Sequence, residues 1–374
     1  MSSDGADIRL ALCGDVMLGR GVDQILPYPG DPTLYGPYAD NANHYVQLAE
    51  RKHGPIPAVR RFDYVWGDAL AEFDAFAPDL RLINLETAIT AQGKPWPRKP
   101  IHYRMNPQNI DVLVRAKIDF CSLANNHTMD WGYASLGETM KALANAGIAR
   151  AGAGRDRARA AAPALLHVPG KGRAIVVSLT TLSGHAPVRW AADAERPGVN
   201  LVEPTDRGLD EVKQAVAGIK QAGDVLIASV HSGNNFGHGI DPAERTFALR
   251  LIGDAGFDLI HCHSSHHVKA IEVHEGRPIL YGSGDVISDY EGIANSPSED
   301  AFRPELGTIA FATLSADTSA CRGLFLRPTR VRQLRVQRAD ADEAAALCAI
   351  LNRESARFGT RIENRDGLLA VVLG

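Results

Sequence analysis

Short apolar runs of strand length recur along the chain, and nearly every position within each run is hydrophobic. Strands buried on both faces show this continuous pattern, whereas strands with one solvated face alternate apolar and polar residues. The pattern therefore predicts strands that are covered on both sides. The runs lie at residues 8–13, 80–85, 120–124, 174–179, 225–230, 259–261, 278–281 and 308–313.

Between several of these runs, apolar residues recur at the spacing of a helix. Thr205 is a candidate N-cap for one of these segments, because its hydroxyl can accept a hydrogen bond from the first helical turn. Strands that alternate with helices predict a layered α/β fold. The helical segments are 109–116, 136–146, 206–222 and 242–255.

Three segments depart from this alternation. Residues 25–60 are rich in proline and tyrosine, and we interpret them as a partly helical insertion that could cover a site, because structureless stretches of this length are unusual. Residues 286–306 are polar and loop-like, and residues 320–374 predict two short strands and a helix at 340–353. We expect residues 1–374 to form a single domain with the insertion at 25–60 and a C-terminal extension at 320–374.

Composition excludes several classes of protein. With 45% hydrophobic and 22% charged residues, the 374-residue chain is typical of a globular protein. Its net charge of −4 offers no basic excess for nucleic acid, so we expect no nucleic-acid partner. The 5 cysteines are scattered, which argues against a disulfide scaffold and favours a reducing compartment. No basic leader and no apolar run of about 18 residues is present, so we expect a cytoplasmic protein without a membrane span.

Polar side chains with metal-binding chemistry follow six of the predicted strands. Ligands bind at the carboxyl ends of the strands in open α/β sheets, so we expect these side chains to lie at one edge. Carboxylate, amide oxygen and imidazole together suit a borderline divalent metal ion such as Mn, Zn or Fe. The side chains are Asp15, Glu86, Asn126, His231, the histidine-rich run at 261–267, and Asp285.

Several motifs, in a fixed order, carry a family resemblance: GDVMLGR, NLET, ANNHTMDWG, HSG, HCHSSHH, KAIEV and YGSGD. Together they resemble the CapA family of poly-γ-glutamate biosynthesis proteins, within the calcineurin-like metallophosphatase superfamily. The resemblance covers roughly residues 8–315 and implies a four-layer α/β/β/α sandwich with a metal centre at the strand ends. It also implies that His127 contacts the substrate. The ligands that it implies are Asp15, Glu86, Asn126, His231, His263 and His266.

This chain departs from the superfamily pattern at the metal ligands. Met17 stands where superfamily phosphatases have a histidine, and Glu86 stands where they have a bridging aspartate. Two residues rather than one separate the late histidines, which leaves their roles open. We therefore expect one tightly bound ion and a weaker second ion. The histidines that compete for these roles are His261, His263, His266 and His267.

Four residues are candidates for substrate binding, each with a plainer alternative. Arg20 can hold a carboxylate or a phosphate bidentately, although a surface ion pair explains it equally well. His102 and Arg104, together with Lys99, form a basic patch for an anionic substrate, or else a solvated loop. We assign Asp285 to substrate binding as well. The alternative is that its carboxylate only forms hydrogen bonds within its loop.

Three functions fit these residues. In the first, a metal enzyme acts on a peptide or on poly-γ-glutamate, and Asp15 and His267 remove and return a Cα proton in an epimerisation. Some CapA-like proteins resemble peptide epimerases of this kind, for instance in lasso-peptide pathways. The second is a phosphoesterase in which His127 assists the leaving oxygen. The third is a non-catalytic partner in the synthesis of a capsule polymer. We favour the metal enzyme, and within it peptide epimerisation.

Overall fold

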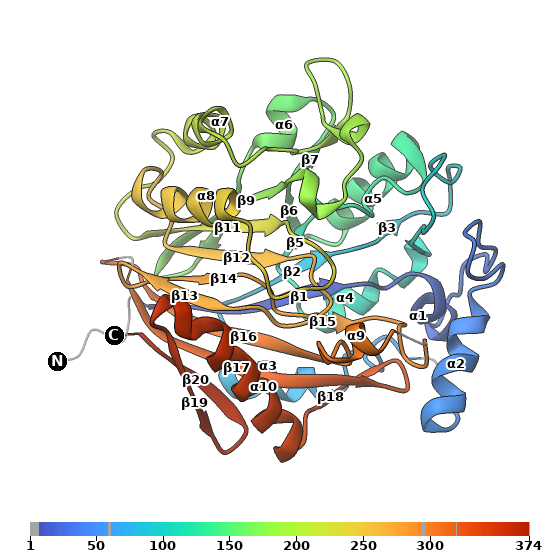
Figure 1. The fold of residues 1–374 in the computed structure, drawn as a ribbon. Coiled ribbons are helices and arrows are strands. Elements are labelled where there is room, and N and C mark those ends of the chain that lie inside the picture. Colours follow the sequence, from blue (N-terminus) through green and yellow to red (C-terminus); the bar gives the residue numbers. More distant parts are fainter. Residues whose placement is uncertain (1–6, 59–60, 294–295, 319, 374) are drawn as a thin grey trace.

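The computed structural model of the chain describes residues 7–58, 61–293, 296–318 and 320–373. Small parts of the predicted segments lie outside these described ranges: residues 1–6 and 374 at the ends of the predicted domain, 59–60 in the insertion, 294–295 in the polar loop, and 319 just before the C-terminal extension. Two sheets stack face to face, and helices cover their outer faces (Figure 1). None of the helices in the described ranges is both long enough and apolar enough to span a membrane.

The larger sheet contains the N-terminal strand at its centre. Its strands, in spatial order, are β19 (Arg361–Arg365), β20 (Leu368–Val372), β17 (Cys321–Arg332), β16 (Leu306–Ser315), β1 (Asp7–Val16), β2 (Leu80–Leu85), β5 (Phe120–Ser122) and β6 (Ala149–Ala151), with β15 (Asp285–Ile287) paired to β1 and β18 (Arg335–Arg338) paired to β17. The pairs β1–β2, β2–β5 and β5–β6 are parallel. Their carboxyl ends therefore meet at one edge.

The smaller sheet has a parallel centre as well, formed by β9, β11, β12 and β14. Its order is β13 (Ile271–His274), β14 (Arg277–Leu280), β12 (Leu259–His263), β11 (Asp224–His231), β9 (Gly172–Thr180) and β8 (Ala164–Val168). Two further pairs are β3 (Ala88–Ile89) with β4 (Arg104–Met105) and β7 (Ala153–Gly154) with β10 (Gly198–Val199).

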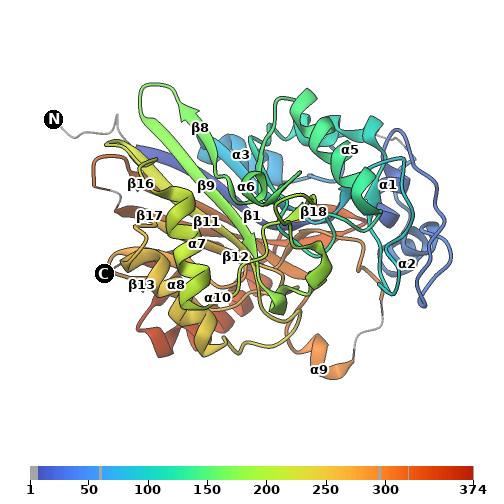
Figure 2. The same ribbon diagram turned by 90° about the horizontal axis from the view of Figure 1, so that it is seen from above.

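The helices complete the outer layers. They are α1 (Arg20–Ile25), α2 (Asn43–His53), α3 (Ala69–Phe76), α4 (Asp111–Arg115), α5 (Gly132–Asn145), α6 (Arg157–Ala161), α7 (Asp206–Val216), α8 (Pro242–Gly253), α9 (Pro297–Asp300) and α10 (Ala341–Ser355). Figure 2, the view from above, shows α7 and α8 lying over β9 and β11.

Three hydrophobic clusters fill the spaces between four layers. On β1, Ala11 belongs to the cluster beneath α3, α4 and α5, while its neighbour Leu12 faces the smaller sheet. On β9, Val176 faces the larger sheet, while Val177 packs beneath α7 and α8. Successive residues of a strand point to opposite faces, so an apolar layer on each side requires continuously apolar strands. The predicted four-layer α/β/β/α sandwich is confirmed.

The predicted elements are present, with informative differences in length. The eight apolar runs all form strands, and the Thr205 hydroxyl accepts from the Gly208 N–H as the predicted N-cap. The helix predicted at 206–222 ends at Val216, because the chain turns at Gly218 with a φ of +70°. The insertion is partly helical, as predicted, since it contains α2.

The expectation of two short strands after residue 320 was wrong. β17 alone is 12 residues long and pairs along β16, and β18, β19 and β20 continue the larger sheet. Buried and exposed positions alternate along much of β17, where arginines such as Arg322, Arg327 and Arg330 interrupt the apolar pattern. One face of this strand is partly solvated, so a search for continuous apolar runs does not detect it.

Candidate metal centre

Asp15 lies at the carboxyl end of β1, facing the ends of β11 and β12 in the smaller sheet, and is 1% exposed. One carboxylate oxygen accepts from Asn84 Nδ2 at 2.6 Å, and the other accepts from the Ser264 main-chain N–H at 3.1 Å. Ser264 has a φ of +107°, which is unfavourable for a serine and is typical of residues held in place at functional sites. Both sheets therefore fix the orientation of this carboxylate.

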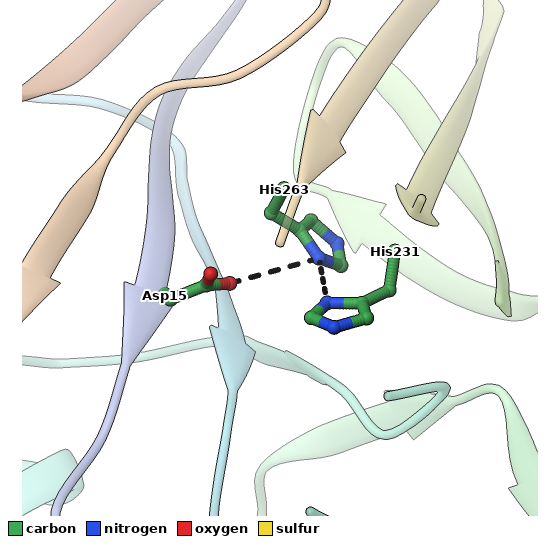
Figure 3. Close-up of side chains that lie close together, drawn as sticks. All are labelled: Asp15, His231 and His263. Atoms are coloured by element: carbon green, nitrogen blue, oxygen red, sulfur yellow. Dashed lines mark hydrogen bonds and ion pairs between the residues drawn. The ribbon is translucent and has the colours of Figure 1, made fainter. Parts of the chain in front are cut away.

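Asp15 forms a first ligand group with His231 and His263, whose candidate ligand atoms all lie within 4.8 Å of one another. Figure 3 shows both imidazoles pointing toward Asp15 from the ends of β11 and β12. The two Nδ1 atoms lie 3.0 Å apart, and His263 Nδ1 lies 3.8 Å from Asp15 Oδ1. Ser229 Oγ contacts His263 Nε2 at 2.9 Å, so the opposite nitrogen faces the centre. Burial lowers the pKa of both histidines well below the usual range, so both are neutral.

A second ligand group also uses Asp15, together with His266 and Asp285. His266 Nδ1 lies 3.0 Å from Asp285 Oδ1. Burial lowers the pKa of His266, but the Asp285 carboxylate outweighs it and the net shift is upward. Burial and then the charge of Asp285 raise the pKa of Asp15 to about 7. Two crowded carboxylates of this kind are stabilised by a bound cation.

Glu86 and Asn126 were both predicted as ligands, and Asn126 Oδ1 is a buried atom without a hydrogen-bond partner in the described ranges. Burial, followed by the negative charges of Asp15 and Asp285, raises the pKa of Glu86 well above its usual range. The Glu86 carboxylate lies 4.0 Å from His127 Nε2 and is outside both groups defined by the 4.8 Å spacing. The residue shared by the two groups is therefore Asp15, and the longer Glu86 side chain extends toward His127.

The donor atoms fit a divalent cation. Among the buried side-chain atoms that have no hydrogen-bond partner in the described part of the chain, three belong to residues predicted to lie at this site: Asn126 Oδ1, His231 Nε2 and Asp285 Oδ2. Buried polar atoms normally have partners, so these point to a missing ligand. Imidazole nitrogens and carboxylate or amide oxygens suit a borderline ion such as Mn, Zn or Fe. Met17 contributes nothing here, because its sulfur accepts from the Gly19 N–H within the helix-side core.

His127 forms an oriented acid–base pair with Asp130 beside the centre. Its Nδ1–H donates to Asp130 Oδ2 at 2.6 Å, and Lys99 Nζ lies 2.8 Å from Asp130 Oδ1. The Tyr103 ring stacks on the imidazole with centroids 3.9 Å apart. Burial and then the Lys99 charge lower the pKa of His127 well below its usual range. The imidazole is therefore neutral, and the lone pair on Nε2 points toward Glu86.

His267 lies next to His266 in the sequence but makes different contacts. Its Nδ1–H donates to the Val268 carbonyl at 2.9 Å, and its Nε2 accepts from the Gly237 N–H at 3.1 Å. The ring stacks on Phe302, and burial lowers its pKa to about 3. With both nitrogens occupied by main-chain groups, these contacts do not suit the proton-transfer role predicted for His267.

The predicted substrate-binding cations are already paired with carboxylates. Arg20 is 6% exposed and donates through Nε to Asp289 at 3.0 Å, with its guanidinium over the Tyr45 ring. This ion pair is buried, so the alternative of a surface ion pair was wrong, while substrate binding by Arg20 stays a prediction. Arg104 pairs at 2.9 Å with Asp31 of the insertion and thereby anchors it.

His102 keeps a buried Nδ1 without a partner in the described ranges, while its Nε2 contacts the Trp96 carbonyl at 2.9 Å. Together with Arg20 it lines a hollow of about 310 Å³ beneath the insertion, where Tyr35 and Tyr38 also lie. Residues of the insertion therefore line this hollow, and the prediction that the insertion covers a functional site stays a prediction.

Sequence reasoning assigned no role to Asn84, which orients Asp15 and whose Nδ2 lies 3.4 Å from His231 Nδ1. The sequence did contain a signal for Asn84. It lies two residues before Glu86, and side chains two residues apart along a strand point to the same face. Asp289 and Tyr290 follow Asp285 near the predicted edge, but sequence reasoning gave them no role. Tyr290 contacts the Tyr103 hydroxyl at 2.8 Å.

Comparison with known proteins gives consistent relatives. Residues 9–290 match the family described as bacterial capsule synthesis protein PGA_cap. A probable polyglutamine synthesis accessory protein of Mycobacterium tuberculosis is 45% identical over 98% of this chain and 96% of its own length. The PGA biosynthesis protein CapA of Bacillus subtilis is 26% identical over 75% of this chain and 63% of its own length. A phosphatase from Mycoplasma pneumoniae is 10% identical, covers 91% of this chain and 96% of its own, and has a TM-score of 0.44, too low to support an inference.

Proposed function

The chain belongs to the PGA_cap family of bacterial capsule synthesis proteins, and we propose that it is a divalent-metal-dependent enzyme acting on peptide or poly-γ-glutamate chains. Asp15, His231 and His263 would hold the ion, with His266 and Asp285 as a second group. When bound, such an ion polarises a carbonyl oxygen and acidifies the neighbouring Cα–H. The relatives named for polyglutamine and PGA synthesis support a substrate of this class.

The observation that carries the proposal is the oriented His127–Asp130 pair. Asp130 holds the imidazole through Nδ1, so Nε2 is free to take a proton and lies 4.0 Å from the Glu86 carboxylate. We propose that His127 removes a Cα proton and that Glu86 takes part in returning one, in an epimerisation. Glu86 accepts no hydrogen bond within the described ranges, so its side chain can move aside for a substrate. Asp15 then serves as a ligand rather than as a base.

The charge around the centre favours a peptide over a phosphate ester. Three basic side chains predicted to lie at or near the site are each paired with an aspartate, so a phosphate dianion would find little free positive charge on these three residues. A substrate amide or a single carboxylate needs less compensation. The pairs are Arg20 with Asp289, Lys99 with Asp130 and Arg104 with Asp31.

The test is exchange of the Cα proton with solvent. The metal-loaded protein is incubated in heavy water with γ-glutamyl oligomers, and mass spectrometry follows the incorporation of deuterium. Because the returning proton comes from a group that exchanges with solvent, we expect a gain of about one mass unit per reacted residue without bond cleavage. His127→Gln should abolish the exchange, while His274→Gln on β13 should not change it.

The second candidate is phosphate ester hydrolysis, because the same His127–Asp130 pair could protonate a leaving oxygen. Metal-dependent release of phosphate from an aryl phosphate, lost in His127→Gln and unaccompanied by Cα exchange, would establish it in place of epimerisation. If neither reaction occurs with any of the metals Mn, Zn and Fe, the chain acts as a non-catalytic partner in polymer synthesis.

A further inference from the structure

A hollow separate from the metal centre lies between the outer face of the smaller sheet and α8. Its empty space, open solvent at its mouth included, amounts to about 470 Å³, and its walls are mainly apolar, with Val230 and Ile260 on the sheet and Phe247 on the helix. In Figure 1, α8 lies over β11 and β12, the strands that form its floor. Two charged side chains, Lys269 and Glu244, also line it. Nothing in the proposed reaction uses this hollow.

Lys269 is the unusual residue in this hollow. It is 4% exposed, and its ammonium group has one weak hydrogen bond, to the Asn234 carbonyl at 3.5 Å. No carboxylate lies within ion-pair distance of it in the described part of the chain. Burial lowers the pKa of Lys269, as expected of an ammonium group removed from water. The charge of Glu244 opposes this shift without forming a direct ion pair, and an ammonium group buried without a direct ion pair is costly unless a ligand supplies a second negative charge.

Glu244 presents a negative charge to the same space. One of its oxygens accepts from the Ser183 hydroxyl, and the other remains directed toward Gly233. A Cβ added at Gly233 would lie 3.0 Å from Lys269 Nζ and 3.8 Å from Glu244 Oε2. The glycine, with a φ of +86°, therefore leaves open the space flanked by the two opposite charges.

We propose that this hollow binds a free α-amino acid with an apolar side chain. Its carboxylate pairs with Lys269, its ammonium group pairs with Glu244, and its side chain packs against Phe247 and Ile260. A ligand with a carboxylate alone would meet the like charge of Glu244, and an amine alone would meet that of Lys269. A zwitterion complements both charges, and the apolar walls accommodate the rest of the molecule.

The hollow adjoins the metal centre through the chain itself. Ser232, which lines it, directly follows His231, and Cys262, which also lines it, directly precedes His263. An amino acid bound here therefore contacts the strand ends that carry both histidines. The proposal does not rest on the reaction proposed above, because it needs neither the ion nor proton transfer.

The test is isothermal titration of the full-length protein with valine, leucine and phenylalanine, at millimolar concentrations. At least one of them should bind. Two relatives of leucine separate the charges: 4-methylvalerate lacks the ammonium group, and isoamylamine lacks the carboxylate. Each should bind more weakly than leucine by roughly tenfold or more, since each leaves one buried charge without a partner.

Variants assign the binding to the two charges. Lys269→Met and Glu244→Gln keep the shape of the side chains, and each should weaken amino-acid binding by roughly tenfold or more. Lys213→Met and Asp210→Asn, at exposed positions of α7, are the matched controls and should not change it. Circular dichroism and the melting temperature report whether each variant is folded, and Glu244→Gln alone suffices if Lys269→Met is not.

Three results would overturn the proposal. The first is that none of the three amino acids binds at millimolar concentration. The second is binding that persists unchanged in the folded variants. The third is binding of 4-methylvalerate as tight as that of leucine, which would make the hollow a plain carboxylate site.

Discussion

The two ligand groups that share Asp15 differ in how their charges are balanced. In the first, the Nδ1 atoms of His231 and His263 face each other at 3.0 Å, and both imidazoles are neutral. In the second, His266 and Asp285 already pair with each other at 3.0 Å. A cation at the first group meets two neutral imidazoles, whereas at the second it must displace a proton from His266. The comparison indicates one strong and one weak metal site.

The difference originates in the local fold. β11 and β12 are parallel neighbours, and their register places His231 directly opposite His263, so both side chains point to the same face. His266 follows in the loop after β12, and Asp285 comes from β15 of the larger sheet. Strand pairing therefore preorganises the first group, while the second depends on a loop and on the stacking of the sheets.

The largest expected effect comes from removing the shared ligand. Asp15→Asn takes a carboxylate from both groups, so dialysed protein should retain almost no divalent ion when measured by elemental analysis. Asp285→Asn is the matched control and should remove only the weaker ion. Retention of one tightly bound ion by Asp15→Asn would mean that the two groups do not share this residue.

The two histidines should then behave differently. His231→Gln should remove the tightly bound ion, because it disrupts the pair of facing imidazoles, whereas His266→Gln should leave that ion in place. Competition with a chelator measures both affinities. Equal losses in the two variants would contradict the distinction between a strong and a weak site.

The pH should separate the two groups more finely. The net upward shift of the His266 pKa, caused chiefly by Asp285 against the effect of burial, means that this imidazole holds its proton to a higher pH than usual. An ion at the second group must displace that proton, so its affinity should already begin to fall at a pH above the ordinary histidine value of about 6.5. The pKa values of His231 and His263 lie well below that value, so they add no proton competition there.

Protonation of Asp15, whose pKa is raised to about 7, weakens both sites together and therefore does not produce a difference between them. Titration of the metal content against pH, with both ions followed separately, provides the measurement. Parallel release curves for the two ions would show that His266 is not the group that distinguishes the sites.

The features of the fold and of the site that could be predicted are those that depend on residues close together in the sequence. Continuous apolar runs predicted the strands, and residues at the strand ends predicted His231 and His263, because register follows from parallel pairing. Adjacent residues of the loop were not separable in this way. His266 turns toward Asp285, while His267 turns toward the main chain of Gly237, and the loop conformation decides which does which.

Contacts between the two sheets could not be predicted from the sequence, because they join residues that are far apart along the chain. The N–H of Ser264 reaches Asp15 across 249 residues of chain, and the positive φ of that serine has no signature in the sequence. The role of Glu86 also depends on contacts that the sequence does not show. Its position in the motif predicts a bridging ligand, which stays a prediction, and in the structure its carboxylate lies 4.0 Å from His127 Nε2.

The smallest expected effect concerns the support of the first group. Ser229 lies two residues before His231 on β11, and its hydroxyl contacts His263 Nε2 at 2.9 Å. This contact keeps Nδ1 directed at the centre, and the loss of such an outer contact typically weakens metal binding by roughly 10- to 100-fold. Ser229→Ala should therefore weaken the tight ion by about tenfold and leave the weak ion unchanged, because His266 and Asp285 do not contact Ser229. The change is measured by chelator competition, with Ser183→Ala as the hydroxyl-removing control outside the centre. An equal loss at both ions would mean that Ser229 supports the fold around the centre rather than the orientation of His263.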